Sequence, residues 1–484
     1  MAGIRSLAKD TAVYGLSSII GRFLNWCLVP LYTIRFAAAE YGIVTYIYSI
    51  VALALIILTY GMETGFFRFT SHEKYSSDPM KVYTTTMLSL AVSSGVFVVL
   101  VLGFLHPISD ALQCRGHESY IAMMAVAVAI DAFTAIPFSY LRYKRRPIRF
   151  AVLKLTGIAL NIGLNLWWIL ICPWLWGTAP DLKYIFLANL VSSAAMLPLL
   201  WPELHGFRWR FDRELWRRML SYSWPLLVLG IAGIMNQTVD KIIFPWLVRD
   251  HGEAMTQLGI YGANYKIAIV MVMFIQAFRF AYEPFIFARS KERGDDRLQA
   301  YSDAMKWFVI FAMVIFLGVM FYLDIIKYFI SPRYFSGLKV VPVIMIAEFF
   351  FGVFFNLSLW YKLTDKTMWG MWFSLLGLAV TIGLNIALVP VMGYMGCAAA
   401  ALCCYGVMMI TSYFVGQKKY PIRYQTGRLL LYFASAVALW TVSVFTSTGN
   451  QWIDMGIRTV MLALWIAAVL RIEHFSPGMI FRKR

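Results

Sequence analysis

Arg22 lies near the middle of an apolar segment, residues 11–34, that is long enough to cross a bilayer. A charged side chain at that depth costs roughly 2.5–3.5 kcal/mol on insertion scales, so such residues usually face a bundle interior or a water-filled cavity. Ser18, Arg22 and Asn25 would share one helical face, because they are spaced by four and three residues. A guanidinium is a planar, permanently charged array of hydrogen-bond donors. This stripe therefore predicts that Arg22 faces a polar cavity or the bundle interior rather than lipid.

A second polar stripe lies in the apolar segment 219–248. It contains Asn236, Gln237, Asp240 and Lys241, and the Lys241 ammonium would add a point charge to the same site. In the alternative interpretation, Lys241 is neutralised by Asp240 or Asp131 and serves only packing. We predict that this stripe lines the cavity opposite the first one.

Asp131 and Glu348 lie in the middle of two further apolar segments, 119–141 and 338–361. Ionisable residues inside a membrane are expensive and commonly mark ion paths or proton relays. Asp131, Glu348 and Asp240 are therefore candidate sites for a coupling proton or cation. Structural roles for these acids remain the alternative.

Two other charged pairs favour structural roles. Arg279 and Glu283 are four residues apart and predict an ion pair within one helix. Glu63 and Arg68 lie near the end of segment 42–67, where they are expected to snorkel and to pair with loop charges.

The composition is that of a polytopic membrane protein. The 484 residues are 60% hydrophobic and only 14% charged, with a mean hydropathy of +0.68, which leaves too little polar surface for a soluble fold. The net charge of +18 fits basic cytoplasmic loops better than nucleic-acid binding. The six cysteines have no CxxC or Cys/His spacing, so neither a metal site nor a catalytic cysteine is predicted.

The apolar segments predict an all-α fold with about 14 transmembrane helices. Each segment is near the ~20 residues that a spanning helix needs, and continuous apolar runs exclude barrel strands. The first segment is not typical of a cleaved signal, because it is long, contains Arg22 and is followed at once by another span. The segments are 11–34, 42–67, 83–105, 119–141, 151–171, 182–201, 219–248, 258–287, 304–323, 338–361, 369–389, 394–415, 429–446 and 452–470.

The distribution of Lys and Arg predicts the orientation. Basic residues concentrate in the N-terminal arm, the alternate connections and the C-terminal tail, including "RYKRRPIR" at 142–149 and "RWRFDRELWRR" at 208–218. Because such loops remain in the cytoplasm, both termini are predicted to be cytoplasmic.

Four matches indicate an internal duplication. "YGIVTYIY" at 41–48, "GFFRFTSHEK" at 65–74, "LRYK" at 141–144 and "GIALNIGLN" at 157–165 resemble segments that begin at 258, 284, 359 and 377, so the offsets are 217 to 220 residues. We therefore expect two six-helix lobes, 1–206 and 207–420, and an additional helix pair with a basic tail, 421–484. At the same offsets Arg22 corresponds to Lys241, and Asp131 to Glu348. The simplest geometry is two halves that face each other across a polar cavity.

These features resemble a known family. "GRFLNWCLVPLYT" (21–33), "EYGIVTYIYSI" (40–50), "GMETGFFRF" (61–69), "VDKIIFPWLV" (239–248) and "FRFAYEPFIF" (278–287) are similar to the polysaccharide transporter family of the multidrug/oligosaccharidyl-lipid/polysaccharide flippase superfamily. The resemblance implies a MATE-like fold in the bacterial inner membrane. It also implies translocation of an undecaprenyl-diphosphate-linked oligosaccharide for surface polysaccharide or O-antigen (lipopolysaccharide) synthesis, with Arg22 engaging the diphosphate. The second arginine typical of helix 1 in lipid II flippases has no clear counterpart here, which disfavours a peptidoglycan precursor.

The expected mechanism is alternating access through a cationic cavity. The sequence contains no GxxxxGK[ST] phosphate loop, so ATP hydrolysis is not expected, and no cofactor is predicted beyond H⁺ or Na⁺ coupling. The expected partners are the lipid-linked oligosaccharide and membrane lipids, with other polysaccharide-assembly proteins as further candidates and no nucleic acid.

Three alternatives remain open. An ion-coupled multidrug exporter of the same fold would favour an acidic or aromatic cavity. A membrane glycosyltransferase or polymerase usually carries a sizeable outer loop or an acidic metal motif. A scaffold for envelope synthesis would not need charges in a cavity.

Overall fold

The computed structural model describes residues 2–71, 78–177, 179–205, 211–289, 295–364, 366, 368–446 and 448–473. The side chains of residues 2–12, 18, 283–285, 287–289 and 295–297 lie outside the description. The described chain is helical and contains no strand. It forms two compact units, residues 1–262 with 374–397 and residues 263–373 with 398–484. The predicted lobes, 1–206 and 207–420, are defined by the sequence repeats, whereas these two units are defined by the contacts within each one. The lobe boundaries therefore stay a prediction.

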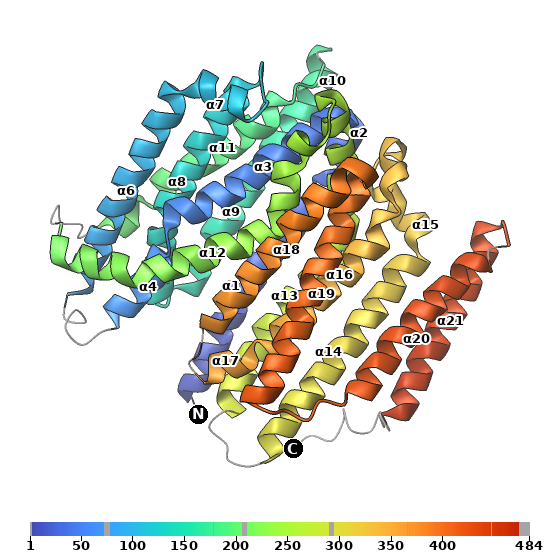
Figure 1. The fold of residues 1–484 in the computed structure, drawn as a ribbon. Coiled ribbons are helices and arrows are strands. Elements are labelled where there is room, and N and C mark those ends of the chain that lie inside the picture. The colour runs from blue at the N-terminus through green and yellow to red at the C-terminus, as the bar shows by residue number, and fades with distance from the viewer. Residues whose placement is uncertain are drawn as a thin grey trace. The chain divides into compact units, whose positions relative to one another are not determined.

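The first unit contains most of the N-terminal helices (Figure 1). They are α1 (Ala2–Trp26), α2 (Val29–Arg35), α3 (Ala38–Thr59), α4 (Met62–Thr70), α6 (Pro79–Gly103), α7 (Leu105–Ala111), α8 (Glu118–Tyr143), α9 (Pro147–Leu166), η1 (Trp167–Ile171), α10 (Cys172–Trp176), α11 (Lys183–Leu199), η2 (Trp201–Leu204) and α12 (Arg213–Leu247). The start of α13 (His251–Arg289), most of α18 (Met368–Met392) and the start of α19 (Tyr394–Lys419) complete it.

The second unit contains the remainder of α13 and α19 and the helices that follow α13. These are α14 (Asp295–Phe321), α15 (Leu323–Ile326), η3 (Lys327–Phe329), η4 (Pro332–Gly337), α16 (Val340–Leu357), α17 (Leu359–Leu363), α20 (Thr426–Phe445) and α21 (Gln451–Ile472). In this unit α14 packs against α16, α20 and α21.

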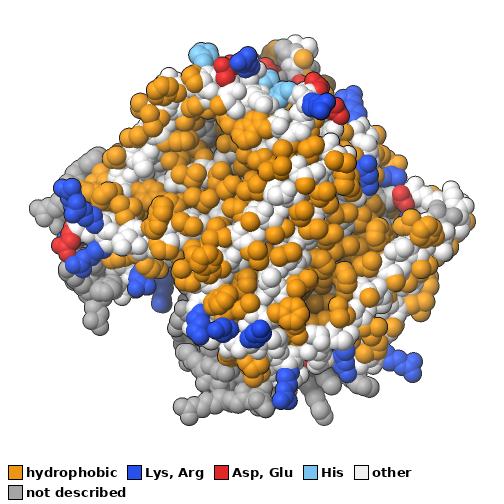
Figure 2. Space-filling model, in the orientation of Figure 1, with side chains coloured by type: hydrophobic (Ala, Val, Ile, Leu, Met, Phe, Trp, Pro, Cys, Tyr) orange, Lys and Arg blue, Asp and Glu red, His pale blue; other side chains and the backbone are white. Residues whose placement is uncertain are grey.

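The predicted all-α membrane fold is confirmed. Each of the fourteen predicted apolar segments corresponds to a helix or to two consecutive helices. Within the described residues, twelve helices are long and apolar enough to cross a membrane, while α11 is shorter, with 17 residues. Figure 2 shows hydrophobic side chains over most of one face, with charged side chains gathered toward its margins. A surface of this kind suits a surrounding of lipid.

Prolines and glycines divide two of the segments. The first segment is divided into α1 and α2, since Pro30 in the first turn of α2 cannot donate a backbone hydrogen bond. The second is divided into α3 and α4 at Tyr60 and Gly61, which have φ angles of 31° and 72°. This left-handed conformation is one that glycine adopts without a steric penalty.

Side-chain caps fix the start of α12. The Asp212 carboxylate accepts a hydrogen bond from the Leu215 amide at 2.9 Å. It also forms an ion pair with Lys81 of α6, with 2.5 Å between the nitrogen and the oxygen. Lys81 and the Leu215 amide together hold the pKa of Asp212 below its usual value. The first unit therefore has a charged contact between α6 and the start of α12.

Helix α8 lies at the centre of the first unit. It packs against α3, α4, α6, α9 and α11, and it supplies Ile136 and Tyr140 to a buried core that α4, α6 and α12 complete. This packing brings charged residues from three helices close together, as described below.

Candidate functional site

Arg22 is exposed on α1, and a close helix contact determines its direction. A Cβ atom on Gly21 would lie 2.5 Å from Cδ1 of Ile158, so only glycine lets α1 approach α9 this closely without a shift. One to two turns earlier, the rings of Tyr14 and Phe150 meet edge to face with centroids 5.1 Å apart. Because Gly21 faces α9, the next residue, Arg22, is rotated by ~100° away from that contact.

The other members of the first predicted stripe follow the same helix. Asn25 is exposed like Arg22, three residues away and therefore on the same face. The side chain of Ser18 lies outside the described part of the structure. Arg22 and Asn25 thus present a donor-rich polar surface at the C-terminal end of α1.

A series of side-chain hydrogen bonds that the sequence interpretation missed connects α2, α9 and α11. Tyr32 donates a hydrogen bond to Oδ1 of Asn165 at 2.9 Å, and Asn161 donates to Ser192 of α11 at 3.4 Å. Nδ2 of Asn165 also donates to the Asn161 carbonyl at 2.8 Å. The two asparagines lie four residues apart in "NIGLN", a spacing that could have indicated one polar helix face.

The same local bond occurs at the repeat-equivalent position. Asn385 in "GLAVTIGLN" corresponds to Asn165, and its Nδ2 donates to the Thr381 carbonyl, also at 2.8 Å. Both asparagines are fully buried. The equivalence supports the internal duplication inferred from sequence.

Lys241 forms an ion pair with its own neighbour. Its Nζ lies 3.1 Å and 3.2 Å from the two carboxylate oxygens of Asp240, and it donates to the Gln237 carbonyl at 2.9 Å. Tyr261 donates to Oδ2 of Asp240 at 2.8 Å. Lys241 and Asp240 are only 8% and 6% exposed. The Lys241 charge is therefore compensated within α12, as one of the two sequence interpretations proposed.

The remaining residues of the second stripe differ in exposure. Asn236 is buried and donates to the carbonyl of Ser374 in α18 at 3.0 Å. The Gln237 side chain is exposed, while its carbonyl accepts from Lys241. Asn236 therefore connects two helices of the first unit, whereas Gln237 is exposed.

Glu348 and Asp131 have different surroundings. Glu348 of α16 is 4% exposed and accepts a hydrogen bond from Tyr265 at 2.6 Å. Asp131 of α8 is exposed and interacts with Ser193 of α11 and with the charge of Lys154. The two acids occupy equivalent positions in the sequence repeats, yet Glu348 is buried whereas Asp131 is exposed and interacts with a lysine.

Lys154 of α9 is a charged residue that the sequence interpretation passed over. It stands four residues into segment 151–171, so it resembles one of the basic residues that commonly end a span. Its Nζ lies over the Phe138 ring, 4.0 Å from the centroid, and it interacts electrostatically with Asp131 and Glu63. Glu63 accepts a hydrogen bond from Ser139 at 3.4 Å and interacts with the charges of Arg142, the first residue of the basic stretch 142–149, and of Lys154.

Two other predicted charged residues contact aromatic rings. The guanidinium of Arg68 lies 4.4 Å from the ring centroid of Tyr222, and that of Arg279 lies 4.5 Å from that of Phe355. The expected partner of Arg279, Glu283, has a side chain outside the described part of the structure.

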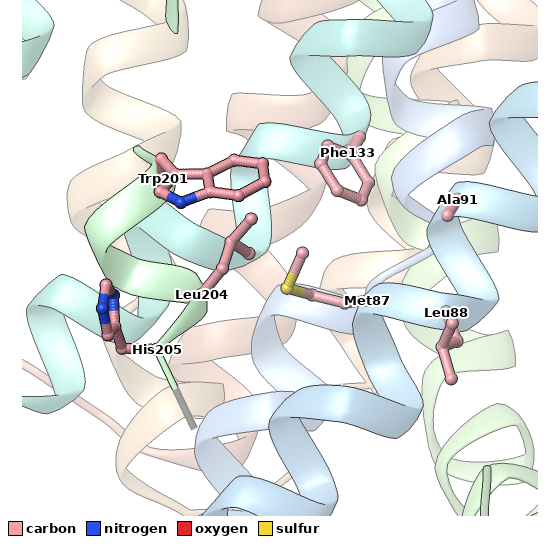
Figure 3. A pocket seen from close by; sticks show the side chains of 7 residues that line it. All are labelled: Met87, Leu88, Ala91, Phe133, Trp201, Leu204 and His205. Carbon is pink, nitrogen blue, oxygen red and sulfur yellow. The ribbon is translucent and has the colours of Figure 1, made fainter. Parts of the chain in front are cut away.

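The first unit also contains a pocket of about 510 Å³. It lies between α6, α8 and η2, and Trp201 and His205 stand at one side of it (Figure 3). The lining residues are Met87, Leu88, Ala91, Phe133, Trp201, Leu204 and His205. None of the predicted site residues lines this pocket. No group of three His, Cys, Asp or Glu residues in the described chain could hold a metal ion.

Residues 7–287 match the model of a family described as "Polysaccharide biosynthesis protein". This match spans more than half of the 484 residues. The chain belongs to this family. A relative from Haemophilus influenzae, described as "Uncharacterized membrane protein", is 20% identical over 316 residues, which are 64% of this chain and 71% of the relative.

Similarity to two solved structures shows that this chain has a MATE-like fold. A structure described as "Lipid II flippase MurJ, inward closed conformation" is 15% identical with a TM-score of 0.72, covering 96% of this chain and 98% of its own. An inward-facing multidrug resistance MATE family transporter of the MOP superfamily is 12% identical with a TM-score of 0.68, covering 85% and 97%. At these identities the likeness concerns the fold alone.

Proposed function

We propose that this multi-pass membrane protein is a flippase. Its substrate would be an undecaprenyl-diphosphate-linked oligosaccharide, moved from the cytoplasmic to the outer leaflet of the bacterial inner membrane during surface polysaccharide or O-antigen assembly. The single observation that carries the proposal is the exposed Arg22 on an apolar helix, next to Gly21, which holds α1 against α9. Membership of the polysaccharide biosynthesis family and the MATE-like fold support the substrate class.

The physical requirement of this substrate agrees with an exposed arginine. A diphosphate cannot cross hydrocarbon without compensation, because unpaired charge in a low dielectric is costly. Arg22 would donate charge-assisted hydrogen bonds to the phosphate oxygens, and Asn25 and Gln237 would add neutral polar contacts. The Lys241 charge is balanced by Asp240, so its contribution to phosphate binding would be smaller than that of Arg22.

Translocation by alternating access would then need a driving force. H⁺ or Na⁺ coupling through a membrane carboxylate is the proposed source, and both termini are proposed to lie in the cytoplasm. No enzymatic step is part of the mechanism. Other polysaccharide-assembly proteins remain proposed partners.

Reconstitution tests this function against that of a multidrug exporter. The purified protein is placed in proteoliposomes with a fluorescent lipid-linked oligosaccharide, and the label accessible to an impermeant quencher is measured over time. A cationic dye such as rhodamine 6G is assayed in parallel vesicles. Transfer of the lipid-linked oligosaccharide without dye transport would support the flippase. Dye transport without oligosaccharide transfer would overturn it in favour of an exporter.

A further inference from the structure

The three carboxylates that the sequence suggests for ion coupling, Asp131, Asp240 and Glu348, differ in their surroundings. Asp240 is buried, paired with Lys241 and hydrogen-bonded by Tyr261. Glu348 is buried and accepts a hydrogen bond from Tyr265. Asp131 is exposed and faces Lys154 of the neighbouring helix α9. Of these three, only Asp131 combines exposure with a lysine on a neighbouring helix.

Lys154 interacts with two carboxylates and forms no direct ion pair with either one in the described chain. Its ammonium lies over the face of Phe138, 4.0 Å from the ring centroid, while Asp131 of α8 and Glu63 of α4 both interact with its charge. A lysine has a long side chain with freely rotating bonds, so it can approach one carboxylate or the other without movement of the backbone. The packing of α8 against both α4 and α9 holds the three groups together.

We propose that Glu63, Asp131 and Lys154 form a proton-driven charge switch inside the first unit. A proton from one aqueous side binds the Asp131 carboxylate, and the Lys154 ammonium then moves toward Glu63. When the proton leaves Asp131 on the other side, the ammonium returns to its position over the Phe138 ring. One proton is bound and one is released in each cycle, and no other bond is formed or broken.

The charges around the switch decide which acid takes the proton. Glu63 interacts with two cations, Arg142 and Lys154, and accepts a hydrogen bond from Ser139. Asp131 interacts with one cation, Lys154, and with the neutral hydroxyl of Ser193. Arg142 is itself held over the Phe67 ring, 5.1 Å from the centroid. Because two cations interact with Glu63 and one interacts with Asp131, the switch places the proton on Asp131.

The same charges favour a proton over Na⁺ as the ion of this switch. A proton forms a covalent bond to one carboxylate oxygen of Asp131, whereas a bound Na⁺ would be repelled by the Lys154 ammonium that interacts with the same carboxylate.

The switch is connected to the substrate residue through α9. Lys154 and Ile158 are four residues apart and share a helix face, and Ile158 is the contact of Gly21 in α1. Arg22 follows Gly21 directly. In this proposal, the change of charge partner at Lys154 alters the contacts of the α9 face that supports α1. This step rests on the proposed function, whereas proton binding at Asp131 does not.

The test uses the whole protein in proteoliposomes and needs no substrate. Dicyclohexylcarbodiimide modifies carboxyl groups in their protonated form, and peptide mass spectrometry gives the fraction of Asp131 modified across a pH series. In the wild-type protein, modification should rise as the pH falls and should not respond to Na⁺. Lys154→Met should move the midpoint of labelling upward by about 1–3 pH units, because an opposite charge has been removed. Lys154→Arg, which keeps the charge, should retain the wild-type midpoint.

Two results would overturn the switch. One is an unchanged midpoint in Lys154→Met, and the other is protection of Asp131 by Na⁺. A second arm measures leaflet transfer of the fluorescent lipid-linked oligosaccharide under a pH gradient or a Na⁺ gradient. Asp131→Asn should lose the response to the pH gradient, whereas Glu348→Gln should keep it. If labelling behaves as expected but no lipid is transferred, the flippase function fails while the proton site stands.

Discussion

The Lys241 ammonium and the Asp240 carboxylate, side chains of consecutive residues, lie 3.1 Å apart in α12 and are both buried. Consecutive residues of a helix normally point in different directions, so the pair depends on the long lysine side chain turning back toward its neighbour. Tyr261 of α13 donates a hydrogen bond to Asp240, and the Gln237 carbonyl accepts one from Lys241. The two charges therefore compensate each other within α12.

Removing one member of this pair should destabilise the protein more than removing both. Lys241→Met leaves the Asp240 carboxylate buried without its cation, at a cost of about 3–5 kcal/mol for a buried pair. The double variant Lys241→Met with Asp240→Asn should recover much of this loss. Thermal unfolding of these two variants and of Asp240→Asn in detergent measures the coupling. If the stability lost in the double variant equals the sum of the losses in the two single variants, the two side chains do not act as a pair.

The contact of Gly21 with Ile158 should control the position of Arg22. Gly21→Leu adds a side chain where even a Cβ meets Cδ1 of Ile158 at 2.5 Å. Overpacking of this kind costs about 1–3 kcal/mol and should move α1 away from α9. Leaflet transfer should fall, and Ile158→Ala in the same protein should restore part of it. No rescue by Ile158→Ala would argue against this contact as the positioning element.

Acid should weaken the attachment of the helix pair α20 and α21. Glu473 follows α21 and accepts from Lys306 of α14 at 2.6 Å and from Tyr432 of α20 at 2.5 Å. Burial alone would raise the pKa of Glu473, but these two hydrogen bonds outweigh it and hold the pKa below its usual value. Because the folded-state pKa is the lower one, the stabilisation is fully present above the unfolded pKa of ~4.3 and is lost as the pH falls through the folded value.

Thermal unfolding of wild-type protein and Glu473→Gln between pH 7 and pH 3 measures this contribution. The wild-type protein should be the more stable at pH 7, and the difference should shrink toward pH 3. A difference that does not change with pH would assign Glu473 a role independent of its charge.

The orientation predicts which cysteines are accessible from outside. In a cysteine-free variant, Lys144→Cys between α8 and α9 should resist an impermeant thiol reagent in intact cells. Trp174→Cys in α10, where the tryptophan is 82% exposed, should react, since this connection is predicted to lie on the outer side. The removal of native cysteines is needed because Cys27 and Cys403 are exposed. Labelling at position 144 and protection at position 174 would reverse the topology.

The helices could be predicted from sequence because each needs only a continuous apolar run, which is a local property. The exposed Arg22 could be predicted as a candidate for the same reason, since a charge stands out in such a run. Lys154 could not, because its position near a segment end looks ordinary until α8, α4 and α9 pack together. The sequence left the partner of Lys241 open, because only the folded chain decides which acid lies within reach.

The most direct test of the central claim is the leaflet-transfer rate of Arg22 variants in proteoliposomes containing a fluorescent lipid-linked oligosaccharide. Removing the charge eases membrane insertion, so Arg22→Ala should assemble normally. Its transfer rate should fall by about 10- to 150-fold, as expected from about 1.5–3 kcal/mol for hydrogen bonds to a charged group. Arg22→Lys should recover part of the rate, because it keeps the charge but loses the forked donors. Arg35→Ala, which removes an exposed arginine of α2, is the matched control and should transfer at the wild-type rate. Wild-type transfer by Arg22→Ala at equal protein content would contradict the account and would leave Arg22 with a structural role.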